Sequence, residues 1–447
     1  MLGSQIIFGL YGRTKKKSEE ITCPADFKPS VTVVIPSKNE SKRLPYALAS
    51  LVRQTYKVDK IIVIDDGSTD NTFEVATLMK NLTDLDIFIM RNDISIGKTP
   101  SIKNALNECT TDKVFVFDAD TILEDNYIEK LVVPHFKNNV ACSYGIVKPL
   151  FEDFKKNFYK TVIKSLLSKS STIRDSKAPF SEKFYNRIFV DKYYHKIISD
   201  NEEDNSLTIQ NILRFRNVRY YLYEWTVTKY REGVYADQYF TREAQKRMFN
   251  TTLFPVGCGV LYDRIKLKGV FQKYGQTLGV NLTTSEDIFI GFEFCDQGLI
   301  NYQVTDAHMW TTEPNIKRLP FQLVLWGSSF IQSAYYFQTL SKRVKGTKYE
   351  RPIGLAILPP IIEKVSYPLA LSAISLVAYE WTLATIGIEF LLFFGISYLS
   401  TPKKERKGLA SSLVVAEPIR LISVPVDIFI LCKFGVDMLI GNRKWKK

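Results

Sequence analysis

Short apolar runs alternate with amphipathic segments along the first third of the chain. Four such runs, at residues 31–35, 61–64, 86–90 and 113–117, have the length and composition of buried strands. Between them, Leu44, Leu48 and Leu51 share one helical face around Pro45, and residues 73–80 and 102–109 also repeat at helical spacing. Strand patterns that alternate with helix patterns predict an α/β fold with a mostly parallel sheet.

Paired carboxylates follow two of the predicted strands. Asp65 and Asp66 come after the second strand, and Asp118 and Asp120 come after the fourth. Ligands gather at the carboxyl ends of the strands in such sheets, and Mg²⁺ is usually held by one or two carboxylates together with substrate phosphates. A D-x-D pattern is also typical of a solvated strand end, so the neighbouring motifs must decide between the two interpretations.

The remaining chain divides into a helical part and an apolar part. Residues 151–250 are rich in Lys, Tyr and Phe, and we expect them to form helices over a substrate cleft. Residues 365–399 are apolar and long enough for two membrane crossings that meet at residues 379–381. Basic segments flank this hairpin and predict cytosolic ends. Residues 413–440 are apolar but carry several charges, so we expect them to lie on the membrane or to form a re-entrant turn.

The net charge of +13 over 447 residues narrows the choice of partners. Aromatic residues do not alternate with basic ones and no DNA-binding motif is present, which argues against a nucleic-acid partner. The positive charge suits an anionic membrane surface or a phosphate-bearing substrate. The six cysteines have no paired spacing, which indicates neither a disulfide scaffold nor a zinc site and favours a reducing compartment.

Several motifs occur in one order along the chain. They read VTVVIPSKNE, IIVIDDGSTDNT, IGKTPSIKNAL and VFVFDADT in the first part, then PVGCGVLYDR, TSEDIFIGFEFCDQGL, AHMWTTEP and QLVLW. As a set they resemble family 2 glycosyltransferases of the GT-A fold, and most closely the membrane-embedded branch that includes hyaluronan, chitin and cellulose synthases. The resemblance implies a Rossmann-like sheet, followed here by membrane helices, and a nucleotide-diphospho-sugar as the donor.

The resemblance also implies roles for the acidic motifs. The residues expected to bind the nucleotide-sugar are Glu40, Asp65, Asp66, Lys98, Asp118 and Asp120. Asp118 and Asp120 are also the expected ligands of Mg²⁺ or Mn²⁺. Such a metal would bridge the donor's diphosphate and neutralise charge that builds up on the departing nucleotide.

Two later motifs match the acceptor side of the family. Glu286 and Asp287 match a TED-type motif, which makes Asp287 the expected general base of an inverting transfer. Acidic residues are equally favourable at a helix start, and both interpretations can hold at once. Gly257, Cys258 and Gly259 resemble a small-residue stretch beside the acceptor, and a tight turn is the alternative.

The sequence departs from the family at one position. The synthase branch carries QxxRW, and here Gln322 and Trp326 match while Leu325 replaces the arginine. The lost guanidinium places processive polymer synthesis in doubt, and Lys317 or Arg318 is a candidate substitute. We expect Gln322 and Trp326 to contact the acceptor; the alternative for Trp326 is an apolar anchor at the membrane.

We therefore expect three regions and one main function. Residues 1–30 form a terminal segment, either at a membrane interface or frayed. Residues 31–340 form the catalytic domain, with a nucleotide-binding half (31–150), a helical insertion (151–250) and an acceptor half (251–340). Residues 341–447 form the membrane region, with about two transmembrane helices and an amphipathic or re-entrant segment.

The expected protein is an integral membrane enzyme with a cytoplasmic catalytic domain. It would be a metal-dependent inverting glycosyltransferase (a hexosyltransferase) that moves a sugar, UDP-linked in our first interpretation, to a lipid or glycan acceptor. A processive polysaccharide synthase is the close alternative, and a catalytically inactive membrane-associated binding protein is the second.

Overall fold

A computed structural model describes residues 3–15, 21–158, 161, 215–278, 285–336, 362, 366–367 and 369–439. Its centre is a sheet with the strand order β3-β2-β1-β4-β7-β6-β8-β5. The strands are β1 (Val31–Ser37), β2 (Lys60–Asp66), β3 (Ile87–Asn92), β4 (Lys113–Phe117), β5 (Thr121–Leu123), β6 (Val140–Pro149), β7 (Gly259–Asp263) and β8 (Ile300–Thr311).

The parallel part of the sheet confirms the sequence prediction. β3, β2, β1 and β4 are parallel neighbours, with Val33 opposite Ile61 on one side and opposite Phe115 on the other. β1, β2 and β4 are almost entirely buried, which explains why they read as continuous apolar runs. The carboxyl ends of these strands therefore meet at one edge of the sheet.

The second half of the sheet was not predicted, and it makes the sheet mixed. β7 is antiparallel to β4 and to β6, β6 is parallel to β8, and β5 is antiparallel to β8. The pairing of β4 with β7 places Phe117 opposite Gly259. The loop before β7 therefore lies beside the end of β4, where the acidic D-x-D sequence begins.

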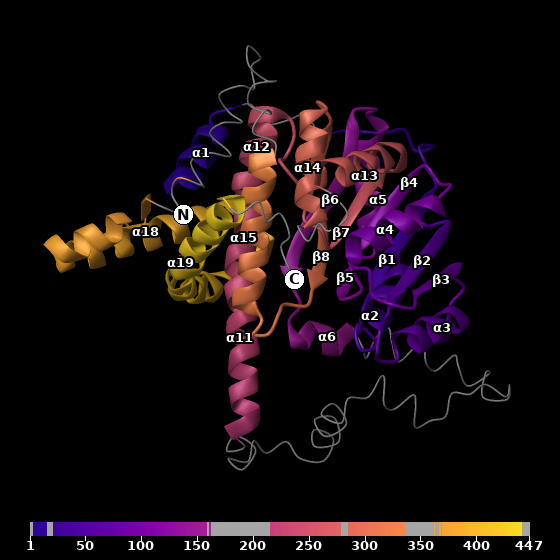
Figure 1. Cartoon of the computed structure of the whole chain (residues 1–447), viewed down its shortest axis with the longest axis horizontal. Helices are drawn as coiled ribbons and strands as arrows, with labels where there is room; N and C mark the ends of the chain where they lie inside the picture. Colours follow the sequence, from indigo (N-terminus) through magenta and orange to yellow (C-terminus); the bar gives the residue numbers. More distant parts are fainter. Residues whose placement is uncertain are drawn as a thin grey trace.

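Helices cover both faces of the sheet (Figure 1). The helices of the described part of the chain include α1 (Gly3–Arg13), α2 (Leu44–Val52), α3 (Thr72–Leu82), α4 (Lys98–Asn107), α5 (Tyr127–Val132), α6 (Glu152–Phe158), α11 (Phe215–Tyr235), α12 (Thr241–Phe249), α13 (Arg264–Leu278), α14 (Glu286–Asp296), α15 (Leu319–Tyr336), α18 (Tyr379–Ser400) and α19 (Leu409–Leu439). Short 3₁₀ helices occupy Val133–Phe136, Ala236–Tyr239 and Lys403–Glu405. The predicted helices around residues 44–52, 73–80 and 102–109 are confirmed by α2, α3 and α4.

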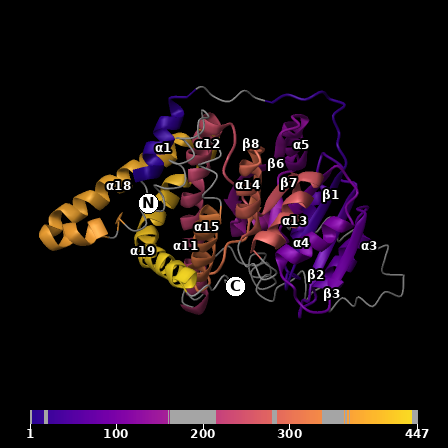
Figure 2. The same cartoon turned by 45° about the horizontal axis from the view of Figure 1, so that its top comes forward.

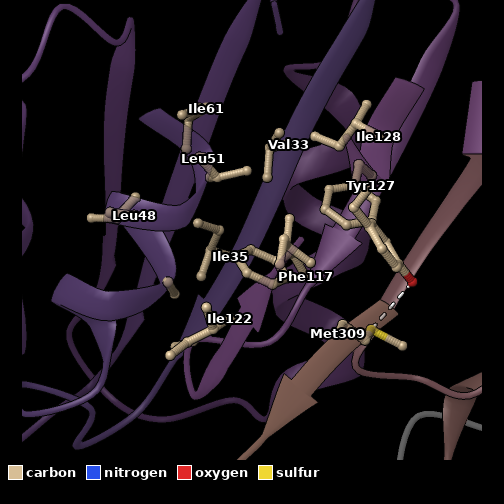
Figure 3. Packing of buried hydrophobic residues seen from close by; sticks show 14 of the residues in the cluster. Val33, Ile35, Leu48, Leu51, Ile61, Phe117, Ile122, Tyr127, Ile128 and Met309 are labelled. Atoms are coloured by element: carbon tan, nitrogen blue, oxygen red, sulfur yellow. Dashed lines mark hydrogen bonds between the residues drawn. The ribbon is translucent and has the colours of Figure 1, made fainter. Parts of the chain in front are cut away.

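One core cluster lies between the sheet and α2, α3 and α5 (Figure 3). Val33, Ile35 and Phe117 are fully buried there, against Leu48 of α2. The second cluster, on the opposite face, packs α4, α12, α13 and α14 against the sheet. Burial of the strands on both faces holds their carboxyl ends in fixed register, which makes that edge a rigid platform for a site.

The expected helical insertion is described only in part. Within it, α11 and α12 are helices. The predicted helical patch at residues 162–167 lies outside the described residues. Of the predicted patch at residues 209–216, only the last two residues are described, at the start of α11. α11 runs beside α15 and α19, between the sheet and α18 (Figures 1 and 2). The division of the chain into domains at residues 30, 150, 250 and 340 stays a prediction.

The apolar C-terminal region contributes α18 and α19. Among the described residues, α18 alone is long and apolar enough to cross a membrane, judged by length and composition. It begins after Ala378, whose extended backbone separates it from a preceding helical stretch at residues 369–377, close to the predicted break. Part of the predicted first crossing lies outside the described residues. α19 packs on α11 and α15 despite Pro418 and Pro425 within it.

Candidate active site

A cavity of about 1300 Å³ lies at the carboxyl ends of β1 and β4. Its walls come from the loops after β1, β4 and β8, from the loop before β7, and from α4, α11, α12, α14 and α15. Most of the residues selected from the sequence line it: Glu40, Lys98, Asp118, Asp120, Gly257, Cys258, Glu286, Asp287, Gln322 and Trp326. Segments far apart in the chain therefore converge on one hollow.

The D-x-D sequence forms a tight turn between β4 and β5. The Thr121 N–H donates to the Asp118 carbonyl (3.2 Å), and the Asp118 N–H donates to the Cys258 carbonyl (3.0 Å). The Asp120 carbonyl accepts from the Thr312 N–H (3.2 Å). Ala119 is buried between the two aspartates, whose side chains both line the cavity. The backbone is thus tied on both sides, and both carboxylates are held at the cavity wall.

Lys98 supplies a cation beside these carboxylates. Its Nζ lies 2.8 Å from Asp118 Oδ1 and 2.8 Å from Glu286 Oε1. Burial alone would lower the pKa of Lys98, but the two carboxylates outweigh burial and raise this pKa well above its usual value. Lys98 therefore stays charged, and it joins the D-x-D turn to the start of α14.

Asp66 lies outside the cavity lining, and its expected contact with the donor stays a prediction. Its carboxylate accepts hydrogen bonds from the Ile96 and Gly97 N–H groups (both 2.9 Å) and from Ser95 Oγ (2.7 Å). These bonds hold the loop that leads into α4. The structure therefore gives Asp66 the task of fixing the loop that presents Lys98.

Asp65 also lies outside the cavity lining. The side chain is 1% exposed, and its Oδ2 lies 3.3 Å from Arg91 Nε. The Ser68 N–H donates to Asp65 Oδ1 (3.1 Å). The expected donor contact of Asp65 stays a prediction.

Negative charge is crowded at the cavity wall that contains Glu40, Asp118 and Asp120. Burial is the main cause that raises the pKa of Asp120 to about 6, and Asp118 adds to it. Burial likewise raises the pKa of Glu40 to about 7, although Arg43, whose Nε lies 2.6 Å from Glu40 Oε2, opposes the rise. Arg43 also approaches Asp120 at 3.7 Å. Carboxylates that repel one another in this way fit a site for an added cation.

Asp118 and Asp120 fit a divalent metal held jointly with a ligand. No group of three or more His, Cys, Asp or Glu suited to a metal occurs within the described ranges. Two carboxylates nevertheless suffice for Mg²⁺ when substrate phosphates complete its coordination. The two carboxylates therefore suit a metal ion that binds together with a phosphate-bearing substrate.

Asp287 lies in the first turn of α14 and faces Gly257. A Cβ atom on Gly257 would lie 2.8 Å from Asp287 Oδ2, so the missing side chain makes room for the carboxylate. Burial raises the pKa of Asp287 to about 7, and the charge of Glu286 adds to the rise. A carboxylate that titrates near neutral pH is suited to accept a proton.

Gly257 and Cys258 form a turn before β7, and both line the cavity. Gly259 does not line it. A Cβ atom on Gly259 would lie 2.7 Å from Met309 Sδ, within the core. The small-residue stretch therefore serves two purposes: space for Asp287 at its first glycine and close core packing at its second.

The cavity wall formed by α15 and α11 contains a guanidinium that the sequence did not reveal. Gln322, Leu325 and Trp326 of α15 line the cavity, as does Arg318, whereas Lys317 does not. Arg231 of α11 lies over the Trp326 ring, with Cζ 4.4 Å from the ring centroid.

Arg231 also pairs with Glu313, and neither residue was selected from the sequence. Glu313 lies within the motif AHMWTTEP, so the sequence did contain a pattern that could have identified it. Arg231 lies in a segment without any motif, so nothing local pointed to it.

Comparisons with known proteins agree with this geometry. Residues 32–198 match the family model described as glycosyl transferase family 2. A stretch of 98 residues is 37% identical to "Uncharacterized glycosyltransferase YaiP" of Escherichia coli (strain K12), over 22% of this chain and 24% of that protein. A stretch of 104 residues is 34% identical to "4,4'-diaponeurosporenoate glycosyltransferase" of Staphylococcus aureus (strain bovine RF122 / ET3-1), over 23% of this chain and 27% of that protein. The chain thus matches only about a quarter of each relative's length.

One solved structure resembles nearly the whole chain. It is the mannosyltransferase PcManGT from Pyrobaculum calidifontis in complex with GDP-Man and Mn²⁺. The likeness has a TM-score of 0.51 at 13% sequence identity and covers 94% of this chain and 95% of that one. At this identity the likeness shows a shared fold.

Proposed function

We propose that the protein is an inverting glycosyltransferase that moves a sugar from a nucleotide-diphospho-sugar to an acceptor hydroxyl. The match of residues 32–198 to the model of glycosyl transferase family 2 supports this proposal, as does the fold shared with the mannosyltransferase PcManGT. The observation that carries the proposal is the convergence of Asp118, Asp120 and Asp287 on one cavity, where Lys98 forms an ion pair with Asp118. A UDP-linked sugar is our first choice of donor.

Asp118 and Asp120 would hold a divalent cation, Mg²⁺ or Mn²⁺, together with the diphosphate of the donor. Such a metal supplies neutralising charge to the departing nucleotide when it is bound. Mn²⁺ is present with the sugar nucleotide in the PcManGT complex. Lys98, fully charged beside Asp118, contributes a fixed positive charge at the same wall.

Asp287 would act as the general base. The acceptor oxygen forms a bond to the anomeric carbon while the bond from that carbon to the diphosphate oxygen breaks. The nucleotide leaves as a diphosphate, and the acceptor proton goes to the Asp287 carboxylate. A pKa of about 7 supports this role, because the group is then substantially ionised near neutral pH and still able to take the proton. The clearance at Gly257 supports it as well.

The reaction would take place at a membrane, with the catalytic domain on the cytoplasmic side. α18 exposes Leu383, Ile388 and Leu391 by 60–69%, and it extends away from the rest of the molecule (Figures 1 and 2). An exposed apolar helix of 22 residues fits a bilayer. The net charge of +13 would favour an anionic lipid surface. A lipid or a glycan would provide the acceptor hydroxyl.

Release of free nucleotide by the purified protein in detergent tests this proposal. UDP-glucose, UDP-N-acetylglucosamine and GDP-mannose are supplied with Mn²⁺, to wild type and to Asp287→Asn. We expect release with one donor in wild type and a loss of about 10²-fold or more in the variant. Asp306→Asn is the matched control, because the Asp306 side chain is 65% exposed and lies outside the cavity lining. Equal release by wild type and Asp287→Asn would contradict the assignment of the base.

A further inference from the structure

A guanidinium lies on Trp326 even though Leu325 stands at the motif's arginine position. Arg231 provides it from α11, with Cζ 4.4 Å from the Trp326 ring centroid and 4.4 Å from the Tyr235 ring centroid. The Arg231 side chain is 8% exposed. A planar guanidinium that stacks on an indole fixes the orientation of the ring.

Arg231 is itself held by a buried carboxylate. Its Nε donates to Glu313 Oε2 (2.9 Å), and its Nη2 donates to the Tyr235 hydroxyl (2.7 Å). The Glu313 side chain is 6% exposed. Burying an ion pair costs desolvation free energy, which is recovered only when the geometry of the pair is good. A buried pair beside the cavity is therefore a candidate for a role in the site.

Glu313 Oε1 is buried without a hydrogen-bond partner among the described residues. Burial raises the pKa of Glu313, and the charge of Arg231 opposes this rise. A carboxyl oxygen accepts hydrogen bonds and Glu313 lines the cavity, so Oε1 can still accept one from a ligand. Buried polar atoms are nearly always paired, and an exception at a cavity wall points to a ligand donor.

The chain links this carboxylate to the D-x-D turn. Glu313 follows Thr312, whose N–H and hydroxyl both donate to the Asp120 carbonyl (3.2 Å each). The negative charge of Glu313 also contributes to the raised pKa of Asp120. Glu313 therefore lies between the expected metal side and the Trp326 side of the same cavity.

We propose that Glu313, Arg231 and Trp326 form a sugar subsite, in which Glu313 Oε1 accepts a hydrogen bond from a sugar hydroxyl and Arg231 takes the place of the motif's arginine. Arg231 is a positioning residue: it holds the Glu313 carboxylate and the Trp326 ring. The inference rests on the proposed function and specifies how that function recognises a sugar. The hydroxyl belongs either to the transferred sugar or to a sugar of the acceptor.

Two binding measurements distinguish these sources. The first compares the Kd of UDP-glucose with the Kd of UDP. UDP is the control because it lacks the sugar. The second measures the KM of octyl glucoside as a sugar-bearing acceptor. In Glu313→Gln we expect either the advantage of UDP-glucose over UDP to fall, or the KM of octyl glucoside to rise, by about tenfold or more, the effect of one hydrogen bond to a charged group. UDP affinity should stay unchanged.

Arg231→Leu tests the positioning role, and Leu325→Arg provides the rescue. We expect Arg231→Leu to reproduce the loss seen in Glu313→Gln, and the double variant Arg231→Leu/Leu325→Arg to regain part of it, because the guanidinium then returns next to Trp326. Lys113→Leu is the matched control: it breaks another largely buried pair, Lys113 Nζ with Asp263 Oδ2 at 2.8 Å, outside the cavity lining.

The near-isosteric Glu313→Gln keeps the inference testable if Arg231→Leu does not fold. Unchanged UDP-glucose preference and unchanged acceptor KM in Glu313→Gln, in an active wild-type background, would overturn the subsite. A wild type that binds UDP-glucose no better than UDP and releases no nucleotide from any donor would instead refute the proposed function itself.

Discussion

Gly257 and Asp287 approach so closely that a side chain on the glycine would collide with the carboxylate. A Cβ atom there would lie 2.8 Å from Oδ2 and 2.9 Å from Cγ of Asp287. A β-carbon almost never comes this near to another heavy atom, so Asp287 must move in any larger variant. The turn before β7 therefore sets the position of the proposed base.

Gly257→Ala should impair turnover by displacing Asp287. A shift of the order of 1 Å in a reacting group costs about 10²-fold in rate, and we expect a loss of kcat of that size with a smaller change in donor KM. Gly269→Ala is the matched control, since nothing lies within 4 Å of its added Cβ. Initial rates of nucleotide release give both values. Equal kcat in Gly257→Ala and Gly269→Ala would contradict the proposed position of the base.

The rate should depend on pH through Asp287. Burial and the charge of Glu286 raise its pKa to about 7, and the base must be deprotonated to accept a proton. We therefore expect kcat/KM to rise with pH through about pH 7 and then level off. Glu286→Gln removes one cause of the raised pKa, so the midpoint should move to lower pH. A midpoint that stays in place or moves to higher pH in Glu286→Gln would argue against Asp287 as the titrating group.

Tyr127 should contribute to the stability of the sheet beneath the site. Its buried hydroxyl lies 3.2 Å from Met309 Sδ (Figure 3). It also donates to the Gly259 carbonyl (2.9 Å) and accepts from the Gly145 N–H (2.9 Å). Tyr127→Phe leaves these backbone groups unsatisfied, which should lower the free energy of unfolding by about 1–3 kcal/mol.

Urea unfolding in detergent measures the effect of Tyr127→Phe. Tyr11→Phe is the control, because Tyr11 is 45% exposed and should change stability by less than about 0.5 kcal/mol. If both variants unfold at the same urea concentration, the Tyr127 hydroxyl does not stabilise the junction of β6 and β7.

Charges on α18 should weaken attachment to the membrane. Ile388 and Leu391 lie near the middle of α18 and are 60% and 68% exposed. A charged residue at the centre of a membrane helix costs about 2.5–3.5 kcal/mol, so Ile388→Glu/Leu391→Glu should lower the fraction retained in membranes after an alkaline wash.

Ile265→Glu is the control for this experiment. Ile265 lies on α13 and is 73% exposed, at a position that the proposal keeps away from the membrane. Equal retention of the α18 variant and wild type in membranes would contradict the proposal that α18 anchors the protein.

The parallel half of the fold could be predicted because its signals are local. β1, β2 and β4 are buried on both faces and read as apolar runs, while Asp118 and Asp120 stand directly after one of them. β6, β7 and β8, which form the mixed half of the sheet, were not predicted, since their partners are distant in sequence. The single motif GCG did locate the turn before β7.

The hydrogen-bond and ion-pair partners of the candidate site residues could not be predicted, for a related reason. Asp65 and Asp66 end β2 as expected, but their oxygens are directed to Arg91, Ser68 and the loop at Gly97, which no spacing rule reveals. The guanidinium near Trp326 arrives from Arg231 on another helix. Only the three-dimensional structure shows that a side chain on one helix lies beside a residue on another helix that is distant in sequence.

The metal dependence of donor binding tests the central claim most directly. The Kd of UDP-glucose, or of whichever donor gives the greatest nucleotide release, is measured with Mn²⁺ and with EDTA for wild type, Asp120→Asn and the control Asp306→Asn. We predict that Mn²⁺ tightens binding by about tenfold or more in wild type and in Asp306→Asn. Asp120→Asn should lose most of this difference. A donor affinity that is the same with and without Mn²⁺ in wild type, or a full Mn²⁺ effect in Asp120→Asn, would contradict a metal held at the end of β4.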